Sequence, residues 1–408
     1  MRILQLCKKF PYPLKDGEAI AVTYLSKALA DLGCEITLLS MNTTKHFSDL
    51  SKLPPAYNHY KHIYDIDLDN SIRVIDAFKN LFSKESYHVS RYVDAAYKQK
   101  LIELLKTEYY DIIQLETLYL APYVPIIKEF SKGLITMRAH NVEFEIWERI
   151  TKNTEFLPKK IYLNYLTSKL KNFELEHLNM YDYLIPVTER DLTTFKKLGY
   201  KNGALALPIG LETNNYIKQG IKTSKKKGLN ICFIGALDWI PNYEGFDWFI
   251  KNVWNKVSLD HDDIYFSVAG RNTPESVKSI KEKNVHIYGE IADAVSFISD
   301  SDIMVVPLFS GSGMRVKILE GMALGKTVIT TSLGLEGISA QHKKELLIAD
   351  SREEFIEMIN YCNSDKYILD HIGKNAREFV IKYYDNKKNA VQLLELYEEL
   401  VISPKYAR

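Results

Sequence analysis

Hydrophobic residues along this chain of 408 residues form short runs separated by longer amphipathic stretches. The run Arg2–Cys7 is followed by a prolyl loop, by a helical pattern over Ala19–Leu32 that ends at Gly33, and by a second run at Glu35–Ser40. This order predicts a parallel βαβ unit. Further runs continue the same alternation at Asp111–Leu115, Ile135–Arg138 and Tyr183–Val187. The pattern predicts one doubly wound α/β domain over residues 1–210.

The composition changes over residues 211–227, where the segment 218–227 is rich in Lys, Gln, Gly, Ser and Thr and predicts a linker. Apolar runs then resume at Leu229–Gly235, Tyr265–Gly270, Val285–Tyr288, Ile303–Leu308, Thr327–Thr331 and Leu346–Ile348. They predict a second α/β domain over residues 228–380. Residues 381–408 continue a helical pattern that is interrupted near 383–386. We expect this last segment to cross back onto the first domain.

The overall composition narrows the class of partner. At 47.1 kDa the chain can bury two cores, so a cleft between two domains is the expected place for a site. Lys plus Arg number 53 and Asp plus Glu number 52, so the chain lacks the basic field that binding to nucleic acid requires. The four cysteines have neither zinc-ligand nor disulfide-framework spacing, which favours a reducing cytoplasm: Cys7, Cys34, Cys232 and Cys362.

No stretch approaches 18 uninterrupted apolar residues, and the N-terminus does not follow the pattern of a signal peptide. We therefore expect a soluble, cytoplasmic protein. The segment Lys159–Lys171 mixes basic and apolar residues at helical spacing. This pattern is typical of a helix that lies on the inner face of a membrane, and also of an ordinary amphipathic helix on the first domain.

The segment Gly311–Gly325 carries the clearest chemical signal. It follows the apolar run Ile303–Leu308 and reads as a glycine-rich turn that leads into a helix, with Arg315 and Lys317 at the helix start. Free backbone N–H groups, the positive end of a helix dipole and two cations together suit a diphosphate. The sequence therefore predicts a site for a nucleotide-type phosphate ester.

These motifs, in this order, resemble the GT-B retaining glycosyltransferases of family 4 (glycosyl transferases group 1). The resemblance is most specific in the second domain, in Gly311–Glu320 with its Gly-x-Gly-x-Arg-x-Lys-x-Leu-Glu pattern. Supporting segments are Gly235–Asn242, Val268–Arg271, Gly325–Ile329 with Gly334, Asp16–Glu18, Arg138–Glu143 and Thr188–Glu189. The resemblance implies two Rossmann-like domains that face each other across a cleft, with the nucleotide sugar bound by the second domain and the acceptor by the first.

The resemblance also implies roles for individual residues. Arg315 and Lys317 would stabilise the diphosphate leaving group without a metal ion, because no Asp-x-Asp cluster occurs on a suitable loop. Glu320 would accept hydrogen bonds from the ribose hydroxyls, and His140 would contact the acceptor or the sugar. Further donor contacts are expected from Gly17, Gly235, Asp238, Asn242, Arg271, Gly311, Ser312, Gly313 and Met314. The implied reaction moves a sugar, from a UDP- or GDP-sugar, onto a glycan, glycolipid or glycoprotein with retention of configuration.

Two positions depart from the family pattern. The family signature has two glutamates eight positions apart, but Ser312 stands eight residues before Glu320. Asp238 and Asn242 occupy the neighbourhood where the family commonly carries an Arg and a Lys. A non-catalytic nucleotide-binding partner subunit and a GT-B nucleotide-sugar epimerase therefore remain alternatives to a glycosyltransferase.

Several of these residues also have purely structural interpretations. Glu320 could pair with Lys317 one helical turn away, and His140 could be a buried histidine at a strand end. Gly17 could simply shape a turn. The cations could be surface charges: Arg271, Arg315 and Lys317. A helix start packed against Trp248 could include Asp238, Trp239 and Asn242. Thr188 could cap a helix.

Overall fold

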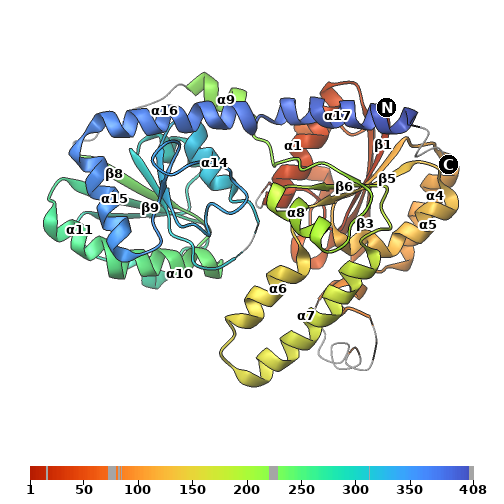
Figure 1. The fold of residues 1–408 in the computed structure, drawn as a ribbon, viewed down its shortest axis with the longest axis horizontal. Helices are drawn as coiled ribbons and strands as arrows, with labels where there is room; N and C mark the ends of the chain where they lie inside the picture. Colours follow the sequence, from red (N-terminus) through yellow and green to blue (C-terminus); the bar gives the residue numbers. More distant parts are fainter. Residues whose placement is uncertain are drawn as a thin grey trace. The chain divides into compact units, whose positions relative to one another are not determined.

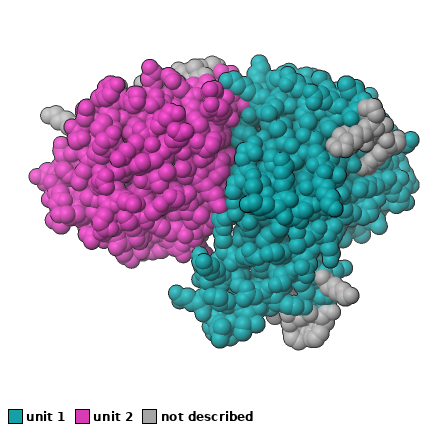
Figure 2. Space-filling model, in the orientation of Figure 1, with its two compact units in different colours: residues 1–210, 386–408 teal, residues 211–385 magenta. Residues whose placement is uncertain are grey.

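A computed structural model of the chain describes residues 1–14, 17–71, 80, 83, 85–219, 228–311 and 313–403. The chain divides into unit 1, formed by Met1–Gly210 with Asn386–Arg408, and unit 2, formed by Leu211–Asp385 (Figure 2). Ser312, Asp16 and residues 220–227 of the expected linker lie outside the described residues. Within the described ranges, no helix is both long and apolar enough to cross a membrane.

Unit 1 is built on a parallel sheet of seven strands in the order β3-β2-β1-β4-β5-β6-β7. The strands are β1 (Arg2–Cys7), β2 (Glu35–Thr43), β3 (His62–Leu68), β4 (Ile112–Leu115), β5 (Leu134–Ala139), β6 (Tyr183–Pro186) and β7 (Gly203–Ala204). Five of them match predicted runs. The edge strand β3 carries aspartates and is only partly buried, and β7 has two residues, so neither forms a clear apolar run.

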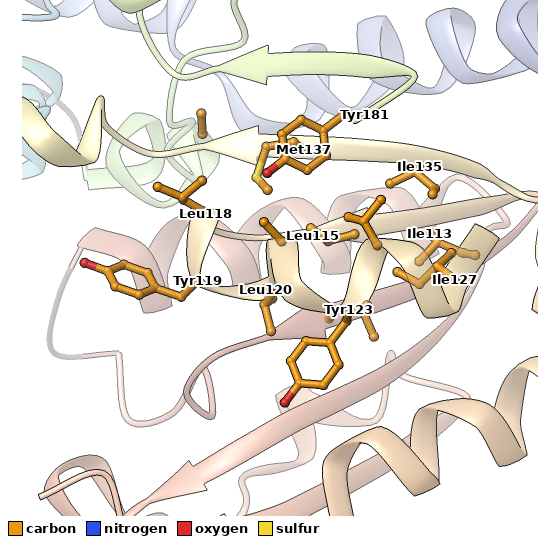
Figure 3. Packing of buried hydrophobic residues seen from close by; sticks show 14 of the residues in the cluster. Ile113, Leu115, Leu118, Tyr119, Leu120, Tyr123, Ile127, Ile135, Met137 and Tyr181 are labelled. Atoms are coloured by element: carbon orange, nitrogen blue, oxygen red, sulfur yellow. The ribbon is translucent and has the colours of Figure 1, made fainter. Parts of the chain in front are cut away.

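Neighbouring residues of each strand point to opposite sides of this sheet, and the apolar side chains on both sides are buried in cores. Ile3 and Ile112 face a core that includes Leu25 of α1, whereas Leu4 and Ile113 face the core in Figure 3. The helices are α1 (Gly17–Asp31), α3 (Tyr87–Ser90), α4 (Ala95–Thr107), α5 (Val124–Phe130), α6 (Glu143–Lys152), α7 (Leu157–His177), α8 (Glu189–Lys197) and α17 (Asn386–Ile402). Short 3₁₀ segments occupy Thr44–His46, Leu50–Lys52, Pro55–Tyr57 and Leu118–Tyr123.

The C-terminal helix α17 belongs to unit 1, as the sequence predicted. Its residues Ala390, Leu393 and Tyr397 are buried in the same core as α1. Asn386 Nδ2 donates to the backbone oxygen of Tyr24 at 2.6 Å, at the start of α17. The chain therefore returns to its first unit after completing the second.

The helices α6 and α7 pack along each other and extend away from the sheet of unit 1 (Figure 1). Leu163, Leu166 and Leu170 of α7 are buried, whereas Leu157 and Ile161 near the start of the same helix are exposed. Lys171 Nζ donates to Glu148 Oε1 at 3.0 Å and links the two helices.

Unit 2 contains a parallel sheet of six strands in the order β10-β9-β8-β11-β12-β13. All six strands were predicted, and they span β8 (Leu229–Ile234), β9 (Ile264–Ala269), β10 (Val285–Gly289), β11 (Ile303–Val306), β12 (Thr327–Thr330) and β13 (Leu347–Ile348). The helices are α9 (Thr213–Gln219), α10 (Ile240–Phe249), α11 (Asn255–Asp260), α12 (Glu275–Lys278), α13 (Ala294–Ser299), α14 (Val316–Ala323), α15 (Arg352–Ser364) and α16 (Lys366–Tyr383), with a π-helical turn at Ile250–Trp254. Its core is rich in aromatic side chains, among them Phe249, Trp254 and Phe355.

Both sheets have the strand order of a Rossmann-like fold, which confirms the predicted fold class. In unit 1 the chain reverses direction across the sheet between β1 and β4, and in unit 2 between β8 and β11. Ligands of such sheets bind beyond the carboxyl ends of the strands at this reversal. The loops after β1, β4, β8 and β11 are therefore the places to examine for function.

Candidate active site

The turn after β11 has the geometry expected of a phosphate-binding loop. Gly311 and Gly313 have φ angles of 98° and 80°, in the left-handed region that favours glycine. The chain then enters α14 with Arg315 as the residue before its first turn. N–H groups in the first turn of a helix lack the usual partner four residues earlier and can bind an anion; here Ile318 N donates to the backbone oxygen of Arg315 at 2.9 Å.

Lys317, Asn242 and Gly235 come together from three separate segments of unit 2. Lys317 Nζ donates to Asn242 Oδ1 at 2.8 Å, and Asn242 Nδ2 donates to the backbone oxygen of Ala236 at 3.0 Å. A Cβ atom at Gly235 would lie 3.0 Å from Asn242 Nδ2 and 3.3 Å from Lys317 Nζ. The absence of a side chain at residue 235 thus allows the lysine and the amide to approach the end of β8.

The electrostatics of this place favour an anion. Burial, together with the nearby charge of Arg315, lowers the pKa of Lys317 to about 7. The Arg315 guanidinium also lies beside the turn, since a Cβ atom at Gly311 would be 3.5 Å from its Nη2 atom. Two cations held close to each other repel, and a bound anion would relieve that repulsion.

Glu320 lies one turn further along α14. Tyr216 of α9 donates its hydroxyl to Glu320 Oε1 at 3.3 Å, and burial raises the pKa of this carboxyl group. Arg377 holds α9 against α14, because it donates to the backbone oxygens of Tyr216 at 2.9 Å and Ala323 at 2.8 Å. The structure therefore places Glu320 next to a tyrosine and Lys317 next to an amide. The interpretation that Glu320 pairs with Lys317 is wrong.

The loops after β8 and β9 touch each other. A Cβ atom at Gly270 would lie 2.1 Å from the backbone oxygen of Gly235, and the backbone oxygen of Arg271 accepts from Leu237 N at 3.0 Å. Asp238 accepts from Asn272 Nδ2 at 2.9 Å. Arg271 is half-buried and Asp238 is exposed, and Met314 is buried beside Arg315.

The interpretation of Asp238, Trp239 and Asn242 as a helix start is confirmed, because they lie at the start of α10, but the expected packing against Trp248 is not seen. Helix α10 begins after Trp239 without a side-chain cap, and the Trp239 side chain is 61% exposed. Trp248 instead packs edge-on against Phe309, with ring centroids 4.5 Å apart. The Asn242 side chain accepts a hydrogen bond from Lys317. These two residues are 75 positions apart, so their spacing in the sequence does not predict the contact.

In unit 1, His140 directly follows β5 and is buried. Its Nε2 atom lies 3.2 Å from Glu116 Oε2, and Gln5 Nε2 donates to the other carboxylate oxygen at 2.6 Å. Burial alone would raise the pKa of Glu116, but the His140 hydrogen bond and the Arg138 charge bring it below its ordinary value. Because Glu116 is ionised, the Nε2 atom of His140 carries a hydrogen and donates it.

Sequence reasoning missed Glu116, although a signal for it was available. Like His140, it is the polar residue that directly follows an apolar strand. The strands β4 and β5 pair in parallel, so residues that follow them lie at the same edge of the sheet. Tyr216 gave no such signal, because its contact with Glu320 depends on how α9 folds over α14.

A second polar group lies at the same edge of unit 1, beside the start of α1. Gly17 is the first residue of α1, and the next residue, Glu18, lies 3.4 Å from Lys8 Nζ. Lys8 Nζ also lies 4.2 Å from the centre of the Tyr119 ring, and Tyr119 donates its hydroxyl to Glu143 Oε2 at 3.0 Å. Burial raises the pKa of Glu143. These side chains join the loops after β1, β4 and β5.

Two further side chains of unit 1, those of Thr188 and Glu174, hold the starts of helices. Thr188 Oγ1 accepts from Asp191 N at 2.9 Å and caps α8, which confirms its structural interpretation. Glu174 of α7 accepts from the backbone N–H groups of Glu143 at 3.1 Å and Phe144 at 3.0 Å, and so holds the start of α6. Burial, together with the nearby Glu143 charge, raises the pKa of Glu174 to about 8.

Comparison with known proteins identifies the class to which this fold belongs. Residues 228–365 match the family model of glycosyl transferases group 1. The matched range includes Gly235, Asn242 and α14 with the turn before it. Solved structures of the GT-B class align over nearly the full chain at low identity, and they establish the fold.

Two solved structures and two sequence relatives are among the proteins that resemble the chain. Sucrose-phosphate synthase from Thermosynechococcus elongatus aligns with a TM-score of 0.69 at 14% identity, covering 98% of this chain and 99% of that one. Anabaena HepE in complex with UDP aligns with a TM-score of 0.68 at 14% identity, covering 98% and 100%. An uncharacterized 44.6 kDa protein in the cps region of Klebsiella pneumoniae is 22% identical over 400 residues, 95% of this chain and 97% of that protein. An uncharacterized glycosyltransferase of Methanocaldococcus jannaschii is 22% identical over 258 residues, 60% and 59% of the two chains.

Proposed function

We propose that this chain is a retaining, family 4-type glycosyltransferase of the hexosyltransferase kind. It moves a sugar from a nucleotide-diphosphate donor, a UDP- or GDP-sugar, to a glycan, glycolipid or glycoprotein acceptor. The observation that carries the proposal is the cradle at the start of α14, where Gly311, Gly313 and the Lys317–Asn242 contact surround the free end of a helix. The family match over residues 228–365 and the UDP bound by the Anabaena neighbour support it.

In the proposed reaction the bond between the sugar C1 atom and the diphosphate oxygen breaks, and a bond from the acceptor oxygen to C1 forms on the same face. The acceptor proton passes to the leaving phosphate oxygen. Arg315, Lys317 and the N–H groups of α14 stabilise the negative charge that develops on that oxygen. Glu320 accepts from the ribose hydroxyls, and the main chain at Gly235 borders the sugar.

We propose that transfer needs no metal ion, because Arg315 and Lys317 supply the positive charge that a metal would otherwise bring to the diphosphate. His140 acts on the side of the acceptor or the sugar. In the neutral imidazole its Nε2–H donates to Glu116, which leaves Nδ1 to accept a hydrogen bond from a hydroxyl group.

We propose a cytoplasmic role in polysaccharide synthesis. The relative named for the cps region supports this assignment, at 22% identity over almost the whole chain. The four cysteines, Cys7, Cys34, Cys232 and Cys362, are all free and buried, as suits a reducing compartment.

A thermal-shift screen with UDP, GDP, ADP, CMP and dTDP, first without metal and then with Mg²⁺, tests the donor site. A nucleotide at a hundred times its Kd stabilises the fold by about 2.7 kcal/mol. We expect a metal-independent shift with one nucleotide, which Arg315→Ala and Lys317→Ala abolish. Lys251→Ala is the matched control, because Lys251 is an exposed lysine of the same unit.

Turnover assays with the nucleotide found in this way separate the classes of function. A glycosyltransferase releases nucleoside diphosphate in an acceptor-dependent manner, and Lys317→Ala abolishes release while the protein stays folded. An epimerase converts the donor sugar without an acceptor. Nucleotide binding with no turnover of any donor would identify a non-catalytic partner subunit.

A further inference from the structure

The turn between α6 and α7 exposes a group of large apolar side chains. Phe156, Leu157 and Ile161 are 68%, 64% and 62% exposed, and Ile150 lies exposed nearby on α6. We call residues 149–162 the hairpin tip. It lies at the far end of the helical pair that extends from unit 1 (Figure 1). A contiguous apolar group of this kind on a protein surface marks an interaction site.

These side chains are not needed to pack the hairpin itself. The two helices contact each other through Thr151 and Thr167, whose hydroxyls lie 3.4 Å apart, and Leu163 of α7 is buried. The turn is fixed by its own backbone bonds, with Asn153 N donating to the Arg149 oxygen at 3.1 Å. Its apolar side chains are thus presented outward on an ordered support.

The charge of the hairpin tip is unbalanced. It contains Arg149, Lys152, Lys159 and Lys160 but a single acidic residue, Glu155, in a chain whose formal net charge is only +1. Arg149 lies 3.9 Å from Glu145. Lys152 and Lys159 form no ion pair with any acidic residue in the part of the chain that the structure describes.

We propose that the hairpin tip docks onto the surface of an anionic lipid bilayer. Phe156, Leu157 and Ile161 would enter the boundary between head groups and acyl chains, and the lysines would stay at the level of the phosphates. A narrow, projecting turn buries little area against another folded protein, which needs about 800 Å² on each side for a stable contact. A bilayer can surround the same projection.

The proposal combines two kinds of contact, since neither is sufficient alone. Apolar insertion is weak for three side chains, and attraction by a few lysines is weak in physiological salt. Each lysine near an anionic surface strengthens binding about fivefold. The inference rests on the hairpin alone, so it does not depend on the proposed transfer reaction.

Flotation of the full chain with vesicles tests the proposal. Vesicles of phosphatidylcholine and phosphatidylglycerol in equal parts are compared with phosphatidylcholine alone, at low salt and at physiological salt. We expect binding only to the anionic vesicles. The triple variant Phe156→Ser, Leu157→Ser, Ile161→Ser should weaken binding at least twentyfold, and Lys152→Ala with Lys159→Ala about twenty-five-fold.

Two controls keep the experiment decisive. Leu259→Ser removes a side chain of unit 2 that is 78% exposed and should leave vesicle binding unchanged. The lysine variant alters exposed charges only and serves where the triple variant is unstable. The proposal is overturned by absence of binding to anionic vesicles at low salt, by unaltered binding of both hairpin variants, or by a dimer in analytical ultracentrifugation that only the triple variant dissociates.

Discussion

Replacement of Lys317 by methionine should remove the pH dependence of nucleotide binding. In the free protein, burial and the charge of Arg315 hold the pKa of Lys317 at about 7. A diphosphate beside the amino group would stabilise its charged form and return the pKa towards the ordinary value of 10.5. Binding should therefore be accompanied by uptake of a proton above neutral pH.

The size of the effect follows from these two pKa values. At pH 7 about half of the free protein carries a charged Lys317, and at pH 9 only about one molecule in a hundred does. The bound state stays charged throughout this range. The affinity for UDP, or for the nucleotide that the screen identifies, should therefore fall about fiftyfold between pH 7 and pH 9, or about 2.3 kcal/mol.

Isothermal titration calorimetry in buffers of different ionisation enthalpy measures both quantities. At pH 8 we expect uptake of about 0.9 proton for each nucleotide bound by the wild type. Lys317→Met should bind weakly, with no proton uptake and a flat pH profile, whereas Lys251→Met should behave as the wild type. A flat wild-type profile, or the same proton uptake by Lys317→Met, would refute this account of the site.

Three further predictions concern other parts of the molecule. Glu320→Gln should reduce the preference for a ribonucleotide over its 2′,3′-dideoxy analogue in the same titrations, because the amide accepts weaker hydrogen bonds from the ribose hydroxyls. An unchanged preference would show that Glu320 does not bind the ribose. Because the folded pKa of Glu174 is raised to about 8, its contribution to stability is present below about pH 4.5 and is lost as the pH rises towards 8. Urea unfolding should then show that Glu174→Gln removes a decline of at most about 1.4 kcal/mol per pH unit, and parallel pH profiles of the two proteins would contradict this. Tyr397→Phe should destabilise unit 1 by about 1–3 kcal/mol, because the Tyr397 hydroxyl donates to the buried Gln114 Oε1 at 2.6 Å; urea unfolding measures this, and a loss near zero would count against it.

Much of the fold could be predicted from the sequence, because the interior strands of a parallel sheet are buried on both faces and form continuous apolar runs. The interior strands have this signature: β8, β9, β11 and β12 of unit 2 and β1, β2, β4, β5 and β6 of unit 1. The edge strands β10 and β13 of unit 2 were predicted from short apolar runs, although β10 is only partly buried. The strand β3 was missed because it lies at the edge, where aspartates at positions 65 and 67 are tolerated beside water. The return of α17 to unit 1 was expected from the interruption near residues 383–386.

The candidate site divides in the same way. The turn at Gly311 and Gly313 and the cations at the start of α14 are contiguous in sequence, so local rules for strands, glycines and helix ends suffice to predict their geometry. Lys317 was recognised as a cation at a helix start. Its pKa of about 7 could not be predicted, because it results from burial among segments distant in the sequence.

The sequence by itself therefore determined the two α/β units and the glycine-containing turn before α14, since these depend on residues within a few positions of each other. Only the tertiary structure decided that Asn242 contacts Lys317, that Tyr216 contacts Glu320 and that Glu116 contacts His140. Such contacts depend on the register of whole strands and on the packing of helices over them. On folding, these side chains exchange water for protein partners, and this exchange sets their charge and their chemistry. Neighbouring residues in the sequence do not predict it.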